Sequence, residues 1–149
     1  MKAHKSPLIL NNFFLLNLNY SFIEPGSNKD IDISNIVSNY ELEIDYTIPE
    51  SIDDNYQLYT KIGVNSVEKP SPGYVLFIEG VCVFTFNKSG KLSEEDISNL
   101  LHFSGLSICI NSLRDILGIA TAHGPFGKYT LPSIDVKKLL ADKKLGIQT

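Results

Sequence analysis

The chain has 149 residues, 43% of them hydrophobic, and its 13 basic and 17 acidic side chains give a formal charge of −4. A chain of this length buries roughly 68–70% of the surface that its unfolded form exposes, so it needs neither a disulfide nor a metal to fold. The composition excludes disordered, collagen-like and coiled-coil chains. Arg114 is the only arginine, and the charge is mildly acidic, which argues against nucleic acid as a partner.

The cysteines and the N-terminus predict a soluble, cytoplasmic protein. Cys82 and Cys109 lie in strongly apolar sequence, where we expect buried, reduced thiols. The basic start followed by apolar residues resembles a signal peptide, but Asn11-Asn12 interrupts the run and no small-residue cleavage site follows. The stretch from Ile97 to Leu113 is too short and too polar for a bilayer span, so we expect no membrane insertion.

Period-two alternation predicts strands in the first half of the chain. The first strand places five apolar residues on one face: Phe14, Leu16, Leu18, Tyr20 and Phe22. The second places Tyr40, Leu42, Ile44, Tyr46 and Ile48 opposite Glu41, Glu43, Asp45 and Thr47. A third strand covers 58–64, and a fourth covers 74–86 with apolar residues on both faces, so both faces should be covered. Turns at 49–55 and 69–73 join strands two to four into a meander, and 24–39 is a long crossover connection.

Helical periodicity replaces the alternation after Asn87. Ser93 and the three acids that follow it predict a helix N-terminus with a capping box, and Gly124 with Pro125 predicts its end near His123. Between 97 and 113 the helix is apolar nearly all round, which predicts self-association. A short amphipathic helix from about Asp135 has three apolar residues on one face: Val136, Leu139 and Leu140.

The residues predict neither a catalytic centre nor a metal or cofactor site. The three histidines have no metal-ligand spacing, and no phosphate-binding loop, nucleophile elbow or dinucleotide fingerprint is present. Glu79 and Arg114 are lone charges in apolar settings, and we expect them to form a structural ion pair between helix and sheet.

The order of the predicted elements resembles that of the SecB-type protein-export chaperones. Three local segments carry the resemblance, which covers roughly 13–140: Ser21-Phe22-Ile23-Glu24-Pro25, Arg114-Asp115 and His123-Gly124-Pro125-Phe126. The resemblance implies an α+β fold, with a four-stranded antiparallel sheet, a crossover after the first strand, a long helix and a short C-terminal helix. We therefore expect 1–149 to form one SecB-like domain.

The resemblance also implies a function: an ATP-independent holdase without cofactors that assembles as a homotetramer, a dimer of dimers. Its clients are unfolded polypeptides, in protein export or as a dedicated client such as an antitoxin. By position, the client groove would be lined by Tyr40, Ile44, Tyr46, Ile48, Val136, Leu139 and Leu140. We assign Phe103, Leu106 and Ile110 of the apolar helix to the oligomer interface.

Four points stay open here. The apolar strips assigned to the groove are equally compatible with an ordinary core. Members of the family carry an acidic tail after the last helix that helps to engage the export motor, whereas this chain closes with Lys143-Lys144 and residues 145–149. Engagement of that motor therefore stays open. A small apolar-ligand carrier or enzyme with a helix-grip fold would instead have a closed apolar pocket, and a structural or regulatory subunit would need a fixed folded partner.

Overall fold

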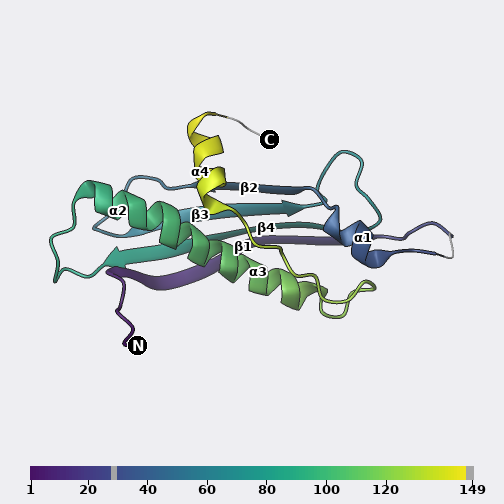
Figure 1. The fold of residues 1–149 in the computed structure, drawn as a ribbon, viewed down its shortest axis with the longest axis horizontal. Coiled ribbons are helices and arrows are strands. Elements are labelled where there is room, and N and C mark those ends of the chain that lie inside the picture. The colour runs from purple at the N-terminus through teal and green to yellow at the C-terminus, as the bar shows by residue number, and fades with distance from the viewer. Residues whose placement is uncertain (28–29, 147–149) are drawn as a thin grey trace.

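The computed structural model describes residues 1–27 and 30–146. Its strands are β1 (Leu8–Ile23), β2 (Leu42–Thr47), β3 (Tyr56–Val64) and β4 (Gly73–Phe86), and its helices are α1 (Ile33–Ser38), α2 (Glu94–Leu100), the π-helical η1 (Leu101–Gly105), α3 (Leu106–Thr121) and α4 (Val136–Lys144). The strands form one antiparallel sheet in the order β1-β4-β3-β2. Helices α2, α3 and α4 lie on one face of the sheet, and α1 lies in the crossover from β1 to β2 (Figure 1). The predicted α+β fold class is confirmed.

The core lies between the two central strands and the long helix. Alternate residues of β3 and β4 face the helices and are at most 1% exposed: Leu58, Thr60, Ile62, Val64, Tyr74, Leu76, Ile78, Cys82 and Phe84. Helix α3 adds Leu106, Cys109, Ile110, Leu113 and Leu117. Because each fully buried Leu or Ile contributes about 1.5–3 kcal/mol, this interface is the main source of stability.

Strand β1 departs from its predicted alternation. Its pairing with β4 shifts register between Leu10 and Asn12 and again between Leu15 and Asn17. Each shift inserts one extra residue, which moves the following side chains to the other face. Leu18 therefore faces the helices, while Phe14, predicted to share its face, lies opposite Val81 on the outer face of the sheet. The prediction of one continuous apolar face from 14 to 22 is wrong.

The outer face of β4 is not covered by any helix in the described part of the chain. Val75, Phe77 and Val83 point away from the helices and are half-buried. Within the described residues of this chain no helix covers that face, so the expectation that both faces of the strand are covered stays a prediction about the assembled protein. Neighbouring side chains on the same face of the sheet account for the partial burial.

The long helix begins as predicted. The Ser93 hydroxyl accepts a hydrogen bond from the Asp96 amide at 3.1 Å, and the Asp96 carboxylate accepts one from the Ser93 amide at 3.3 Å. Helical structure continues through α2, η1 and α3 and ends at Thr121, two residues before the expected end. By length and composition alone, Glu94–Thr121 is long and apolar enough to cross a membrane, and a core helix passes the same test.

The turn after the long helix is held by Tyr74 of β4. Its hydroxyl donates to the Gly127 carbonyl at 2.7 Å and accepts from the Phe126 amide at 3.2 Å. A Cβ atom at Gly124 would lie 2.3 Å from this hydroxyl, so only glycine fits there. This contact explains the glycine in the His123-Gly124-Pro125-Phe126 segment.

The two cysteines form a disulfide, so the expectation of separate reduced thiols is wrong. Cys82 of β4 and Cys109 of α3 have Cα atoms 6.1 Å apart, a separation typical of disulfides. Both are almost completely buried, and the bond joins the long helix to the sheet. Apolar flanking sequence cannot reveal this pairing, because it depends on how the helix crosses the strand.

We expect reduction of this disulfide to destabilise the protein. The bond closes a loop of 27 residues, and loss of that constraint corresponds to about 3.5 kcal/mol in the chain-entropy estimate. Urea unfolding of the wild type should show this decrease when a reductant is added. The Cys82→Ala/Cys109→Ala double variant should not respond to the reductant, and an equally insensitive wild type would contradict the prediction.

Candidate functional site

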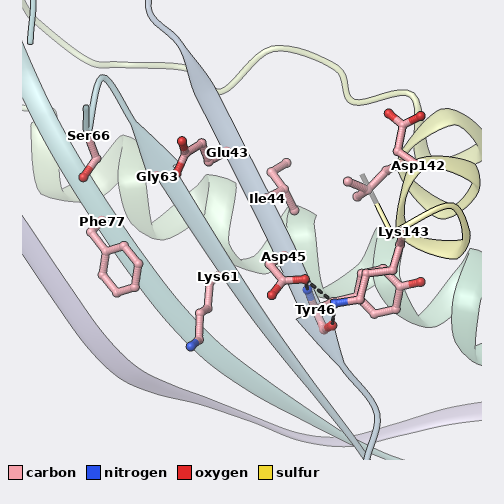
Figure 2. A pocket seen from close by; sticks show the side chains of 12 residues that line it. Glu43, Ile44, Asp45, Tyr46, Lys61, Gly63, Ser66, Phe77, Asp142 and Lys143 are labelled. Carbon is pink, nitrogen blue, oxygen red and sulfur yellow. Dashed lines mark hydrogen bonds and ion pairs between the residues drawn. The ribbon is translucent and has the colours of Figure 1, made fainter. Parts of the chain in front are cut away.

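Two hollows meet at the free edge of β2. The first has a volume of about 430 Å³ and lies where β2 approaches α4, and Figure 2 shows the side chains that line it. Its lining includes Ile44 and Tyr46 of β2 and Leu139 and Lys143 of α4. The second, about 700 Å³, lies between the end of β2, the turn that follows, α2 and η1. It is lined in part by Ile48, Tyr56, Ile97, Leu101 and His102, and it shares Tyr46 and Lys143 with the first hollow.

The residues predicted to line a client groove fall into two groups. Ile44, Ile48, Val136 and Leu139 are half-buried, whereas Tyr40, Tyr46 and Leu140 are 6–7% exposed and belong to the core. Ile44 and Leu139 line the first hollow and Ile48 lines the second. The lining of the two hollows includes neither Val136 nor Leu140. Four of the seven predicted residues therefore lie in the core or away from the hollows.

Tyr40 is a scaffold residue. Its hydroxyl donates to the Pro72 carbonyl at 3.0 Å and accepts from the Tyr74 amide at 2.9 Å, which fixes the turn before β4. At Gly73 in this turn φ is +101°, and an added Cβ atom would lie 2.1 Å from the Tyr40 hydroxyl. Burial raises the pKa of Tyr40 above its ordinary value. Its assignment to the groove is corrected, because both its ring and its hydroxyl are used inside the fold.

Tyr46 lies beneath Lys143, between the two hollows. The Lys143 ammonium is 5.0 Å from the centre of the Tyr46 ring, a cation–π distance. His102 contacts the same ring edge-to-face at a centroid distance of 5.9 Å. Burial, and then the negative charge of Asp45, raise the pKa of Tyr46. The aromatic surface expected to bind clients is thus covered by a lysine of α4.

Lys143 also forms an ion pair with Asp45 of β2, and its ammonium donates to the Tyr46 carbonyl at 2.8 Å (Figure 2). The hydrogen bond from Lys143 is the main cause of the lowered pKa of Asp45. Both side chains are substantially exposed, so the pair adds less than about 1 kcal/mol to stability. Sequence reasoning missed this contact because 98 residues separate the partners.

The segment that leads into α4 is held by Arg114. Its guanidinium donates to the carbonyls of Leu131 at 2.9 Å and Pro132 at 3.0 Å. The predicted pairing with Glu79 is wrong, because Glu79 lies on the outer face of the sheet, 3.9 Å from the Lys61 ammonium. Arg114 thus anchors the beginning of the α4 segment, and Lys143 anchors its end.

The predicted interface residues on the long helix are also divided. Leu106 and Ile110 are 0% and 2% exposed because they pack against the sheet, so they are core residues and not surface residues. Phe103 is 43% exposed and Ile119 is 74% exposed. Because the sequence of this helix is apolar nearly all round, it does not distinguish residues that pack against the sheet from residues that are exposed.

Within residues 1–27 and 30–146, no group of three or more His, Cys, Asp or Glu side chains is arranged to hold a metal ion. Both hollows lie at the edge of the sheet, with charged residues on their rims. A helix-grip carrier would place its pocket between the long helix and the sheet. The second hollow lies at the N-terminal end of that contact, whereas Leu106 and Leu113, at its middle, are fully buried in contact with the core.

Comparison with solved structures finds neighbours of similar fold. The SecB-like chaperone Rv1957 of Mycobacterium tuberculosis, in complex with a ChAD peptide from the HigA1 antitoxin, has a TM-score of 0.62 and 11% sequence identity over 86% of this chain and 91% of that chain. The fold is SecB-like. A protein of unknown function from Streptococcus agalactiae matches with a TM-score of 0.42 and 10% identity, covering 87% of this chain and 100% of that one. No family model matches the chain, and no sequence relative was found among curated proteins.

We expect alkaline pH to destabilise the protein through its buried tyrosines. Burial raises the pKa of Tyr129 to about 12, from 10.0, so the folded state keeps a proton that the unfolded state releases. The stability that this proton provides is fully present below pH 10 and is lost as the pH rises towards the folded-state value. Urea unfolding at stepwise increasing pH should show this loss. The Tyr129→Phe variant should lose less stability over the same range, and equal loss in both proteins would contradict the prediction.

Proposed function

We propose that the protein is an ATP-independent holdase that binds non-native polypeptide segments at the β2–α4 edge. The observation that carries this proposal is the pair of apolar residues Ile44 and Leu139 beside the outer edge of β2, with which no strand of residues 1–27 or 30–146 pairs. The SecB-like fold supports it, as does the solved complex of a SecB-like chaperone with an antitoxin peptide.

Binding at this site requires no chemical step. Apolar client side chains gain about 25 cal/mol for each Å² that they bury, and backbone pairing with a free strand edge depends little on sequence. The rim carries both signs of charge, including Glu43, Asp142 and Lys143. The proposed clients are therefore extended, apolar segments of an unfolded chain, such as an exported precursor or an antitoxin.

Strand β1 is proposed as the first self-association surface. It is a 16-residue edge strand, and six of its large apolar side chains are 41–51% exposed: Ile9, Leu10, Phe14, Leu15, Leu16 and Tyr20. A long apolar strand edge is a template for pairing with another chain unless it is covered. A second copy that pairs through β1 would cover it.

The exposed side of the long helix is proposed as the second self-association surface. Two apolar residues of the helix are exposed there, Phe103 near its beginning at 43% and Ile119 near its end at 74%. Using this surface together with β1 builds a dimer of dimers. In this proposed interface, the exposed residues Phe103 and Ile119 take the place of Leu106 and Ile110, which are buried in the single chain.

One variant on each surface tests the proposed tetramer. Leu16→Lys places a charge on the β1 edge, and Ile119→Asp places one on the exposed side of α3, so each should reduce a four-subunit particle to two subunits in light scattering. Both positions are exposed, so the fold should be retained by circular dichroism. A wild-type monomer, or variants with unchanged mass, would contradict the arrangement.

The holdase proposal is tested with α-lactalbumin that is reduced and carboxamidomethylated, and hence permanently unfolded, in parallel with its native form. The wild type should bind only the unfolded form. Ile44→Asp should weaken binding at least about tenfold, because it removes an apolar contact of about 1.5–3 kcal/mol. Ile52→Asp makes the same change at a position that is 69% exposed and should bind like the wild type. Equal binding by the two variants would exclude this groove, and equal binding of native and unfolded probe would exclude the function.

A further inference from the structure

The alternation of hydrogen bonds between β2 and β3 shows which backbone groups of β2 point to its outer edge. The Asn65 amide donates to the Glu41 carbonyl at 2.8 Å, so these two residues form a hydrogen-bonded pair. In an antiparallel ladder such pairs alternate with pairs that are not hydrogen-bonded. Glu43 and Asp45, which lie opposite Gly63 and Lys61, therefore bond to β3. The backbone groups of Leu42, Ile44 and Tyr46 point outward, where an added strand would bind.

At Tyr46, the last of these three residues, side chains already bond to the outward-pointing backbone groups. The Tyr46 amide donates to the Asp45 carboxylate at 2.9 Å, and the Tyr46 carbonyl accepts from the Lys143 ammonium at 2.8 Å. Asp45 thus supplies an acceptor and Lys143 a donor, as the backbone of a residue on an added strand would. No such substitute from residues 1–27 or 30–146 bonds to the edge at Leu42 and Ile44.

The same lysine separates the two hollows. Lys143 and Tyr46 line both of them, and the ammonium lies over the Tyr46 ring. Because Arg114 holds the other end of the α4 segment by two hydrogen bonds to backbone carbonyls, release of Lys143 frees only the C-terminal end. That movement would uncover the Tyr46 ring and the Tyr46 carbonyl together.

We propose that Asp45 and Lys143 form a latch that limits strand addition to Leu42 and Ile44 until an extended client segment displaces Lys143 from Tyr46. This inference rests on the proposed holdase function and adds its regulation. The occupant is a non-native polypeptide segment in strand conformation, since the side chains it displaces imitate the hydrogen bonds of a strand. Displacement joins the two hollows into one longer groove that includes the Tyr46 ring. The latch therefore opposes binding by the free energy needed to break it.

The test compares Lys143→Met with Lys137→Met, which makes the same change at an exposed position of α4 outside both hollows. The probe is the reduced, carboxamidomethylated α-lactalbumin, which carries no added charge. Lys143→Met should bind it about fivefold more tightly than Lys137→Met, because a fivefold change in affinity corresponds to the free energy of one exposed ion pair. Asp45→Asn, which breaks the latch from the strand side, should also bind more tightly. Added salt should strengthen binding by the wild type more than binding by Lys143→Met, because it screens the pair.

The outcomes separate the latch from the function. If the wild type binds the unfolded probe and Lys143→Met and Asp45→Asn bind no more tightly than Lys137→Met, the latch is refuted and the holdase function stands. If no protein binds the probe, the proposed function fails and the latch fails with it. Circular dichroism and thermal unfolding of all four proteins show whether the variants keep the wild-type fold.

Discussion

The structure depends on the packing of one long helix against the central strands of the sheet. Leu58 and Ile62 of β3 and Ile78 of β4 are completely buried on that face, and Leu113 and Leu117 of α3 cover them. This packing buries the helix-facing side of the two middle strands, β3 and β4. Strands β1 and β2 form the two edges of the sheet. Both proposed interactions follow from this division: β1 is left for self-association and β2 for clients. The disulfide between β4 and α3 reinforces the same contact.

Local patterns were sufficient to predict most of the fold. Alternation located β2 and β3, an apolar run on both faces located β4, and the capping box at Ser93 located the start of the long helix. The errors concern pairs that are distant in sequence or irregular in register. The bulge between Leu15 and Asn17 reverses the faces of β1, and no residue type specifies it. The Cys82–Cys109 bond depends on a crossing of helix and strand that periodicity does not describe.

The candidate site was predictable only in its apolar part. Ile44 and Leu139 were assigned to the groove by position, from the resemblance to SecB-type chaperones, and both lie on apolar strips of the sequence. Tyr40 was misassigned because an aromatic residue at the start of such a strip looks the same whether its hydroxyl binds a turn or faces a groove. Lys143 was missed because surface lysines on a short helix carry no signal of their partner. Its contacts with Asp45 and Tyr46 became evident only in three dimensions.

The most direct test of the central claim is amide hydrogen exchange of the wild type with and without the unfolded probe. If clients add to the β2 edge, the Leu42 and Ile44 amides, which point outward, should exchange more slowly in the complex. The Glu43 and Asp45 amides, which bond to β3, should change little. Protection confined to β1, or absent from β2 despite binding, would contradict the account.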